Sequence, residues 1–174
     1  DQYRTLQDSD LPNMWYVDDG MKFEGSGLTT ITGLSHLEGA TVAVLTDGAA
    51  IPERVVTGGS ITLDYPANVV IVGLPYEMTL IPMFLESSAI MVAAAIVRLW
   101  RSGSAKVRIN DGDFSRLAMP ANDWNDAPPL QTGYSEKVVI GSDWNRNVSV
   151  ELVGRSPLPL NIQAITLEFE VGRH

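Results

Sequence analysis

The stretch from Gly33 to Tyr76 constrains the fold more than any other, because turn residues interrupt it at short and regular intervals. The runs between these interruptions are rich in β-branched residues, and they read TVAVL, RVV, SITLD and VVIV. Short runs of this kind, separated by Gly, Asp or Pro, are typical of antiparallel strands. We therefore expect residues 33–76 to form a small β-meander or barrel-like module.

The Asp47-Gly48 dipeptide separates the first two of these runs. An Asp-Gly pair between apolar strands predicts a tight hairpin turn, which requires positive φ angles that glycine adopts without strain. Gly73 follows the last run, and we expect this glycine also to be needed for its backbone geometry.

The segment from Ser87 to Arg101 is the hardest to assign. Its alanines, methionine and leucine favour a helix, whereas residues 97–101 alternate in polarity and so do residues 105–109 beyond the Ser102-Gly103-Ser104 turn. We predict strand over helix here, with the two alternating segments paired as a β-hairpin.

The last strand that we expect runs from Ile162 to Val171. Its apolar side chains occupy alternate positions, opposite a row of polar ones, so one face should be dry and the other wet. The apolar row is Ile165, Leu167, Phe169 and Val171, and the polar row is Thr166, Glu168 and Glu170.

These patterns together predict an all-β chain, an antiparallel β-sandwich with the small barrel-like module inserted into it or packed beside it. Residues 1–13 are polar and lack periodicity, so we expect an arm or linker. Residues 14–32 and 77–174 are expected to form the sandwich and residues 33–76 the module, because the strands on either side of the module have no partners inside it.

Composition argues against several classes of function. The net charge is −9 and the twelve basic residues are scattered, which disfavours a phosphate-binding surface and tight nucleic-acid binding. With no cysteine and only His36 and His174, neither a thiolate metal site nor a triad around a core histidine is expected. We expect no catalytic residue, no metal and no cofactor. The longest apolar run, Ala89 to Val97, is too short for the ~20 residues of a membrane-spanning helix.

Two loops hold candidate ligand-binding residues. Asn110-Asp111-Gly112-Asp113 gathers oxygen ligands of the kind that Ca²⁺ prefers, but no glutamate closes the loop at the expected distance, so we expect a plain turn. Asp-Trp-Asn occurs twice, around Trp124 and Trp144. An exposed indole can stack on a sugar ring while Asp and Asn bind its hydroxyls. The alternative is that Trp124 and Trp144 anchor their loops on the core.

The module also carries a recognisable pattern, L-E-G-x-x-V-x-V-L-x-D-G, then G-x-I-T-L, then V-x-V-G-L-P-Y. It resembles a module of the tail nozzle, or tail tubular protein B, of short-tailed bacteriophages, and it is similar to the small FCCH β-domain of ubiquitin-activating enzymes. Segments 17–25 and 157–168 resemble further parts of the same phage proteins. The structural signature consists of Gly33, Leu37, Gly39, Val42, Asp47, Gly48, Gly59, Leu63, Val72, Gly73, Leu74 and Tyr76.

The resemblance implies a structural, non-enzymatic component of a phage tail, located in the virion. It implies self-association into a ring, six-fold in that family, on the path of the exiting genome and in contact with neighbouring tail or adaptor proteins. Those proteins have a much larger N-terminal part, so we expect this chain to be a fragment. An acidic balance suits a passage that repels DNA. The alternative is a non-catalytic glycan- or protein-binding β-sandwich module that uses loops 110–131 and 141–147.

Overall fold

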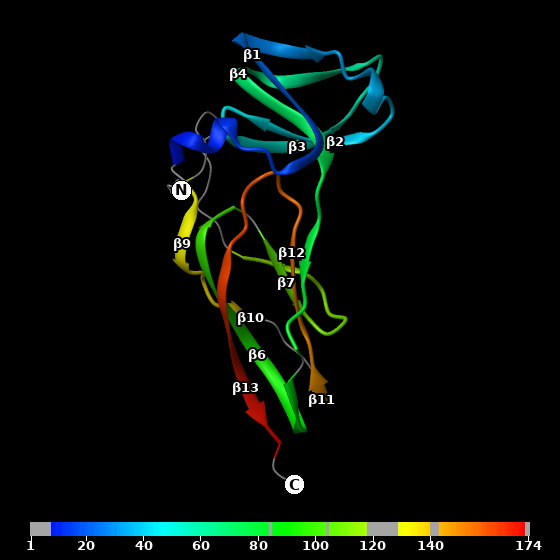
Figure 1. The fold of residues 1–174 in the computed structure, drawn as a ribbon. Helices are drawn as coiled ribbons and strands as arrows, with labels where there is room; N and C mark the ends of the chain where they lie inside the picture. The colour runs from blue at the N-terminus through cyan, green and yellow to red at the C-terminus, as the bar shows by residue number, and fades with distance from the viewer. Residues whose placement is uncertain (1–7, 84, 104, 118–128, 140–142, 173–174) are drawn as a thin grey trace, which may run out of the picture. The chain divides into compact units, whose positions relative to one another are not determined.

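The computed structural model describes residues 8–83, 85–103, 105–117, 129–139 and 143–172. The chain divides into two compact units, of which the first is built mainly on residues up to Tyr76 and the second mainly on residues from Glu77 onward. Apart from two short 3-10 helices, η1 (Asp8–Asn13) and η2 (Ser35–Leu37), the described regular elements are strands (Figure 1). The chain is therefore all-β, as predicted.

The first unit contains one antiparallel sheet, with strand order β1-β4-β2-β3. Its strands are β1 (Val17–Thr32), β2 (Thr41–Thr46), β3 (Ala49–Val55) and β4 (Ser60–Pro75). The SITLD and VVIV runs form the two halves of β4, which continues through the Pro66 break as one strand of 16 residues. β2 buries four successive residues, Val42 to Leu45, so both faces of this central strand are covered.

The turn between β2 and β3 has the predicted geometry. Thr46 pairs with Ala49, which leaves Asp47 and Gly48 as a two-residue connection with φ angles of 47° and 89°. Positive φ at both positions defines the hairpin turn whose twist matches that of the flanking strands. The prediction for Gly48 is confirmed.

Gly73 is required for a different reason. It lies inside β4 and does not end that strand. A Cβ at this position would be 2.7 Å from the carbonyl oxygen of Asp18 and 2.9 Å from Cα of Gly20. Gly73 therefore permits the close approach of β1 to β4.

The second unit contains two sheets, which we call the β6 sheet and the β12 sheet after their central strands. In the β6 sheet, β6 (Leu85–Ser102) pairs with β9 (Gln131–Tyr134), β10 (Val138–Val139), β11 (Asn145–Val148) and β13 (Ile162–Val171). Each of Ile90, Ala94 and Arg98 pairs both with β13 and with one of the three short strands. The short strands therefore follow one another along the side of β6 opposite to β13 (Figure 1).

The β12 sheet has the order β5-β12-β7-β8, with β5 (Met78–Leu80), β7 (Lys106–Ile109), β8 (Ser115–Arg116) and β12 (Val150–Gly154). One buried cluster draws on both sheets of the unit, since it includes Val97 and Leu99 of β6, Val107 of β7 and Leu152 of β12, all of them fully buried. Apolar side chains of the two sheets thus share one core.

The segment 87–101 lies in a strand, as predicted, but the predicted hairpin with residues 105–109 is wrong. β6 and β7 belong to different sheets. The end of β6 is already bonded to other segments, because the N–H of Trp100 donates to the carbonyl of Asn161 and the N–H of Arg101 donates to Oγ1 of Thr132. The short connection after Ser102 leads the chain into the second sheet.

The predicted domain boundaries are also wrong at the N-terminal side. Residues 14–32 do not join the second unit, as the predicted sandwich requires, because β1 pairs with β4 along most of its length within the first unit. Residues 33–76 are therefore not a unit by themselves. Of the predicted arm, residues 8–13 form η1, which buries Leu11 and is joined to β1 through a 2.6 Å hydrogen bond from Lys22 Nζ to Asn13 Oδ1. Residues 1–7 lie outside the described residues.

The dry face predicted for β13 is only partly dry. Ile165 and Leu167 pack against the core of the unit. Phe169 and Val171 are 49% and 51% exposed. These two residues are not part of the buried cluster, so the core does not cover this end of β13. No described helix of the chain is long and apolar enough to cross a membrane.

The two glycines of the first sheet give a stability test. Gly73→Ala is expected to lower the free energy of unfolding by roughly 2–3 kcal/mol, because the added methyl group meets backbone atoms that cannot rotate away. Gly48→Ala is expected to lower it by about 1 kcal/mol, through the positive φ alone, and Gly48→Asn by less, because Asn tolerates that angle. Urea unfolding of the three variants measures their free energies of unfolding and so tests this ranking. A smaller loss at Gly73 than at Gly48 would contradict a role in close approach.

Candidate functional site

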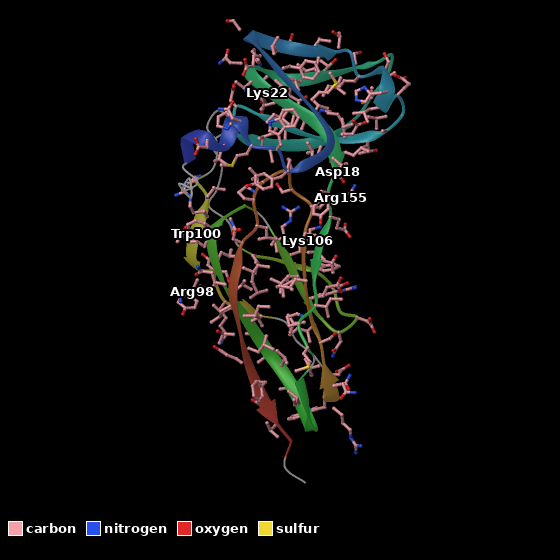
Figure 2. The ribbon with its side chains drawn as sticks, in the orientation of Figure 1. Asp18, Lys22, Arg98, Trp100, Lys106 and Arg155 are labelled. Carbon is pink, nitrogen blue, oxygen red and sulfur yellow. The ribbon has the colours of Figure 1, made fainter. Side chains whose placement is uncertain are left out.

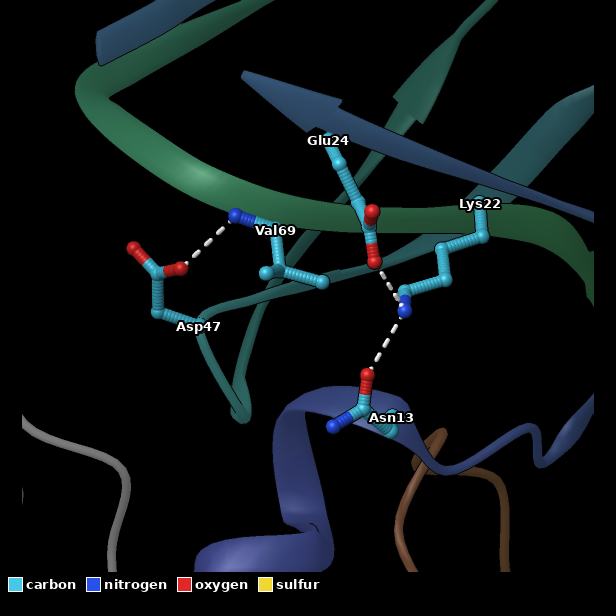
Figure 3. Close-up of polar contacts among 5 residues, drawn as sticks. All are labelled: Asn13, Lys22, Glu24, Asp47 and Val69. Atoms are coloured by element: carbon cyan, nitrogen blue, oxygen red, sulfur yellow. Dashed lines mark hydrogen bonds and ion pairs between the residues drawn. The ribbon is translucent and has the colours of Figure 1, made fainter. Parts of the chain in front are cut away.

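The carboxylate of Asp47 holds the hairpin turn against β4. Its Oδ1 accepts the N–H of Val69 at 2.8 Å (Figure 3). Both oxygens also accept the N–H of Asn68, at 3.0–3.1 Å. The N–H of Asp47 donates in turn to the carbonyl of Val69 at 2.8 Å. Charge-assisted bonds to N–H groups are stronger than neutral ones, so this side chain fixes the turn and the middle of β4 together.

Glu38 has the same role at the turn before β4. Its two carboxylate oxygens accept the N–H groups of Gly58, at 2.9 Å, and Gly59, at 2.6 Å. Both glycines lie in the turn and have positive φ. Glu38 was not among the predicted signature residues, although it stands in the L-E-G motif.

The other signature residues build the first unit. Leu37, Val42, Leu63 and Val72 are buried, and Leu74 packs against their cluster. Gly33, Gly39 and Gly59 have φ between 65° and 91°. Tyr76 is 57% exposed, and nothing in the structure explains its place in the pattern. The motif thus marks turns and core, and brings no reactive groups together.

Asn110 and His36, two of the polar candidates, have structural partners. Oδ1 of Asn110 accepts the N–H of Ser149 at 3.0 Å, so this side chain serves the turn. Nε2 of His36 lies 3.7 Å from Oδ2 of Asp19. Partial burial raises the pKa of the Tyr16 phenol above its ordinary value. Within the described ranges, no three His, Cys, Asp or Glu side chains are grouped so that they could hold a metal ion.

Of the two tryptophans predicted as ligand-binding residues, the structure describes Trp144. Trp124 lies outside the described residues. Trp144 is 51% exposed, and its six-membered ring lies 3.3 Å from the position that a Cβ on Gly172 would occupy. The indole therefore contacts the chain just after β13 and leaves about half of its surface to solvent.

A second group of exposed side chains, which was not predicted from the sequence, lies on β6 and β9. Arg98 pairs in register with Tyr134, and its guanidinium carbon is 5.5 Å from the centre of the tyrosine ring. Trp100 follows two residues later and so points to the same face of the strand; Figure 2 shows Arg98 and Trp100 close together. Trp100 is 39% exposed and Tyr134 64%. We call these three residues the aromatic–arginine surface.

Two buried serines fix the backbone beneath this surface. Ser135 and Ser102 are the buried polar residues of the described chain. Ser135 follows Tyr134 and Val97 precedes Arg98 in the chain. Oγ of Ser135 accepts the N–H of Val97 at 3.1 Å, which ties the two segments together next to the exposed pair.

Oγ of Ser102 plays the equivalent role at the other end of the surface. It accepts the N–H of Asn161 at 2.8 Å and lies 3.1 Å from the carbonyl oxygen of Trp100, to which it can donate. Buried hydroxyls with satisfied hydrogen bonds make a rigid local backbone, so the exposed side chains stand on fixed positions.

The sequence contained part of this signal. The alternation Val97-Arg98-Leu99-Trp100 places Arg98 and Trp100 on one face. Tyr134 could not be added, because its place opposite Arg98 depends on the register of β9 against β6.

Three apolar side chains are exposed at the opposite end of the β6 sheet: Phe169, Val171 and Trp144. Glu168 and Glu170 alternate with the apolar residues along β13. Glu168 forms an ion pair with Lys137. Glu170 forms no ion pair with a residue that the structure describes.

Comparison with known proteins gives no match to a family model and no match to a curated protein.

The role of the Asp47 carboxylate can be tested by two substitutions. Asp47→Ala leaves two backbone N–H groups without their acceptor and removes a residue that tolerates positive φ, so we expect a loss of roughly 2–3 kcal/mol in unfolding free energy. Asp47→Asn keeps an acceptor and the tolerance, so it is expected to lose less than half as much. Chemical denaturation and amide exchange at Val69 measure both. Equal losses of unfolding free energy in the two variants would show that the side-chain oxygen that Asn retains does not stabilise the turn.

Proposed function

We propose that this chain is a structural, non-catalytic part of a bacteriophage tail that packs against copies of itself in a ring. The observation that carries the proposal is the aromatic–arginine surface. Interface residues that contribute most binding energy are enriched in Trp, Tyr and Arg. In this chain all three types stand together, exposed, on a backbone fixed by buried serines.

The resemblance to tail nozzle proteins supports the same proposal. The signature residues that carry it set the turns and core of the first unit, so the likeness concerns how the fold is built and not a reactive site. In the virion the ring would lie on the path of the exiting genome, six-fold as in that family, and would contact neighbouring tail or adaptor proteins.

The negative charge of the chain supports the proposed place on the path of the exiting DNA. A net charge of −9 repels phosphates, which lets a nucleic acid pass without being held. Tight binding would need clustered Lys and Arg that release counterions.

A glycan-binding module is the second candidate, because half of the Trp144 surface is open to solvent. If it holds, a glycan array shows binding that Trp144→Ala abolishes, since the indole would supply the stacking surface. Trp15→Ala, at a tryptophan exposed to the same extent in the first unit, is the matched control. Under the tail proposal the array is negative for all three proteins.

The tail proposal predicts self-association without affinity for DNA. Light scattering is expected to give a mass that is a multiple of 18.9 kDa and rises with protein concentration. A titration with duplex DNA at low ionic strength is expected to show no binding at micromolar protein, since the acidic surface repels phosphate. A chain that is monomeric at every concentration, or that binds DNA in a salt-sensitive manner, contradicts the proposal.

A further inference from the structure

We infer that copies of this chain contact each other head-to-tail through the β6 sheet, with the aromatic–arginine surface of one copy receiving the Phe169-Glu170-Val171 end of β13 from the next. This inference rests on the proposed function, and it names the partner as a second copy and both halves of the contact. Three properties of the two surfaces support it: their positions, their charge and their exposed apolar area.

The two surfaces lie at opposite ends of one sheet. Arg98 pairs with Ala164 at one end of β13, and Met91 pairs with Glu170 at the other. Arg98 and Met91 are seven positions apart along β6, which corresponds to roughly 23 Å at 3.3 Å per residue. The surfaces cannot meet within one copy. A contact between unlike surfaces is heterologous, and repeating it closes a ring or continues as a filament.

Arg98 and Glu170 carry opposite charges, and neither forms an ion pair with a residue that the structure describes. Two other cations of the second unit have an acidic partner. Nε of Arg108 bonds Glu151 at 2.6 Å while its guanidinium lies over the ring of Phe114, and Lys137 pairs with Glu168. Arg98 stacks on Tyr134 but forms no ion pair with a described residue, and the same holds for Glu170. Stacking leaves the in-plane N–H donors of Arg98 available for a carboxylate.

The apolar parts match as well. Phe169 and Val171 are about half exposed at the end of a strand, and Trp100 and Tyr134 offer aromatic faces. Phe169 and Val171 lie on one face of β13 and Glu170 on the other, so a copy that approaches from the edge of the strand meets both rows: the apolar side chains can cover the aromatic rings while Glu170 reaches Arg98. The structure describes no strand paired with the side of β13 away from β6, and the N–H and C=O groups of such an edge can bond a neighbouring strand.

The fixed backbone favours such a contact. Association loses free energy when side chains and loops must be ordered at the interface. Ser102 and Ser135 already hold the segments that carry Trp100 and Tyr134, which reduces that loss.

A charge-reversal cycle tests the inference. Arg98→Glu and Glu170→Arg are each expected to weaken self-association of the chain at least about tenfold, because each places like charges together, and the double variant is expected to recover most of the affinity. Lys106→Glu is the matched control: Lys106 is an exposed cation on β7 without a described ion pair, and both Lys106→Glu and Arg98→Glu change the net charge by two, from −9 to −11. Sedimentation velocity measures affinity, and circular dichroism checks the fold. Arg98→Gln and Glu170→Gln replace any reversal that unfolds the chain.

The outcomes separate this contact from self-association itself. If the chain self-associates but the double variant does not recover, or Lys106→Glu weakens it as much as Arg98→Glu, the contact is wrong and the proposed function stands. If the chain never self-associates, both fall. Glycan binding that is lost on Trp100→Ala by an otherwise monomeric chain would instead overturn the inference in favour of a sugar-binding surface.

Discussion

Two long strands carry most of the backbone pairing in this protein, and each unit depends on one of them. A chain without long helices must satisfy its buried N–H and C=O groups between segments. β4 does so with β1 on one side and β2 on the other, and β6 with β13 on one side and β9, β10 and β11 on the other. Where a short partner strand ends, the groups left over need another acceptor or donor.

Side chains supply those partners, and this links stability to the exposed surfaces. Glu38 accepts the N–H groups of Gly58 and Gly59 in the turn before β4, and Asp47 accepts those of Asn68 and Val69 in the middle of β4. In the second unit Ser135 and Ser102 do so beside β9 and the start of β13. The bond from the N–H of Val97 to Ser135 is buried, and an unpaired buried N–H costs about 1–3 kcal/mol, so such side chains stabilise the fold. In the second unit they also fix the backbone that carries the exposed Trp100 and Tyr134.

Local signals in the sequence were enough to predict strands and turns, and insufficient to predict their partners. The β-branched runs and the Asp47-Gly48 turn are decided by neighbouring residues, so the strand assignment at 87–101 and the turn geometry were correct. The pairing of β1 with β4 and the separation of β6 from β7 depend on segments far apart in the chain, so the domain boundary and the hairpin were wrong. The same limit applies to the site: alternation relates Arg98 to Trp100, but only the sheet register adds Tyr134.

Self-association of an acidic chain requires that short-range contacts outweigh long-range repulsion. Copies with a net charge of −9 repel one another, but at physiological salt the Debye length is about 8 Å, so charges further apart than this contribute little. What remains is the local match at the contact. An arginine held on a tyrosine ring, beside an exposed tryptophan, gives an acidic partner with apolar neighbours a favourable place to bind. The end of β13 combines those two properties, and because the two ends of the sheet lie far apart, the contact that we propose joins two different copies.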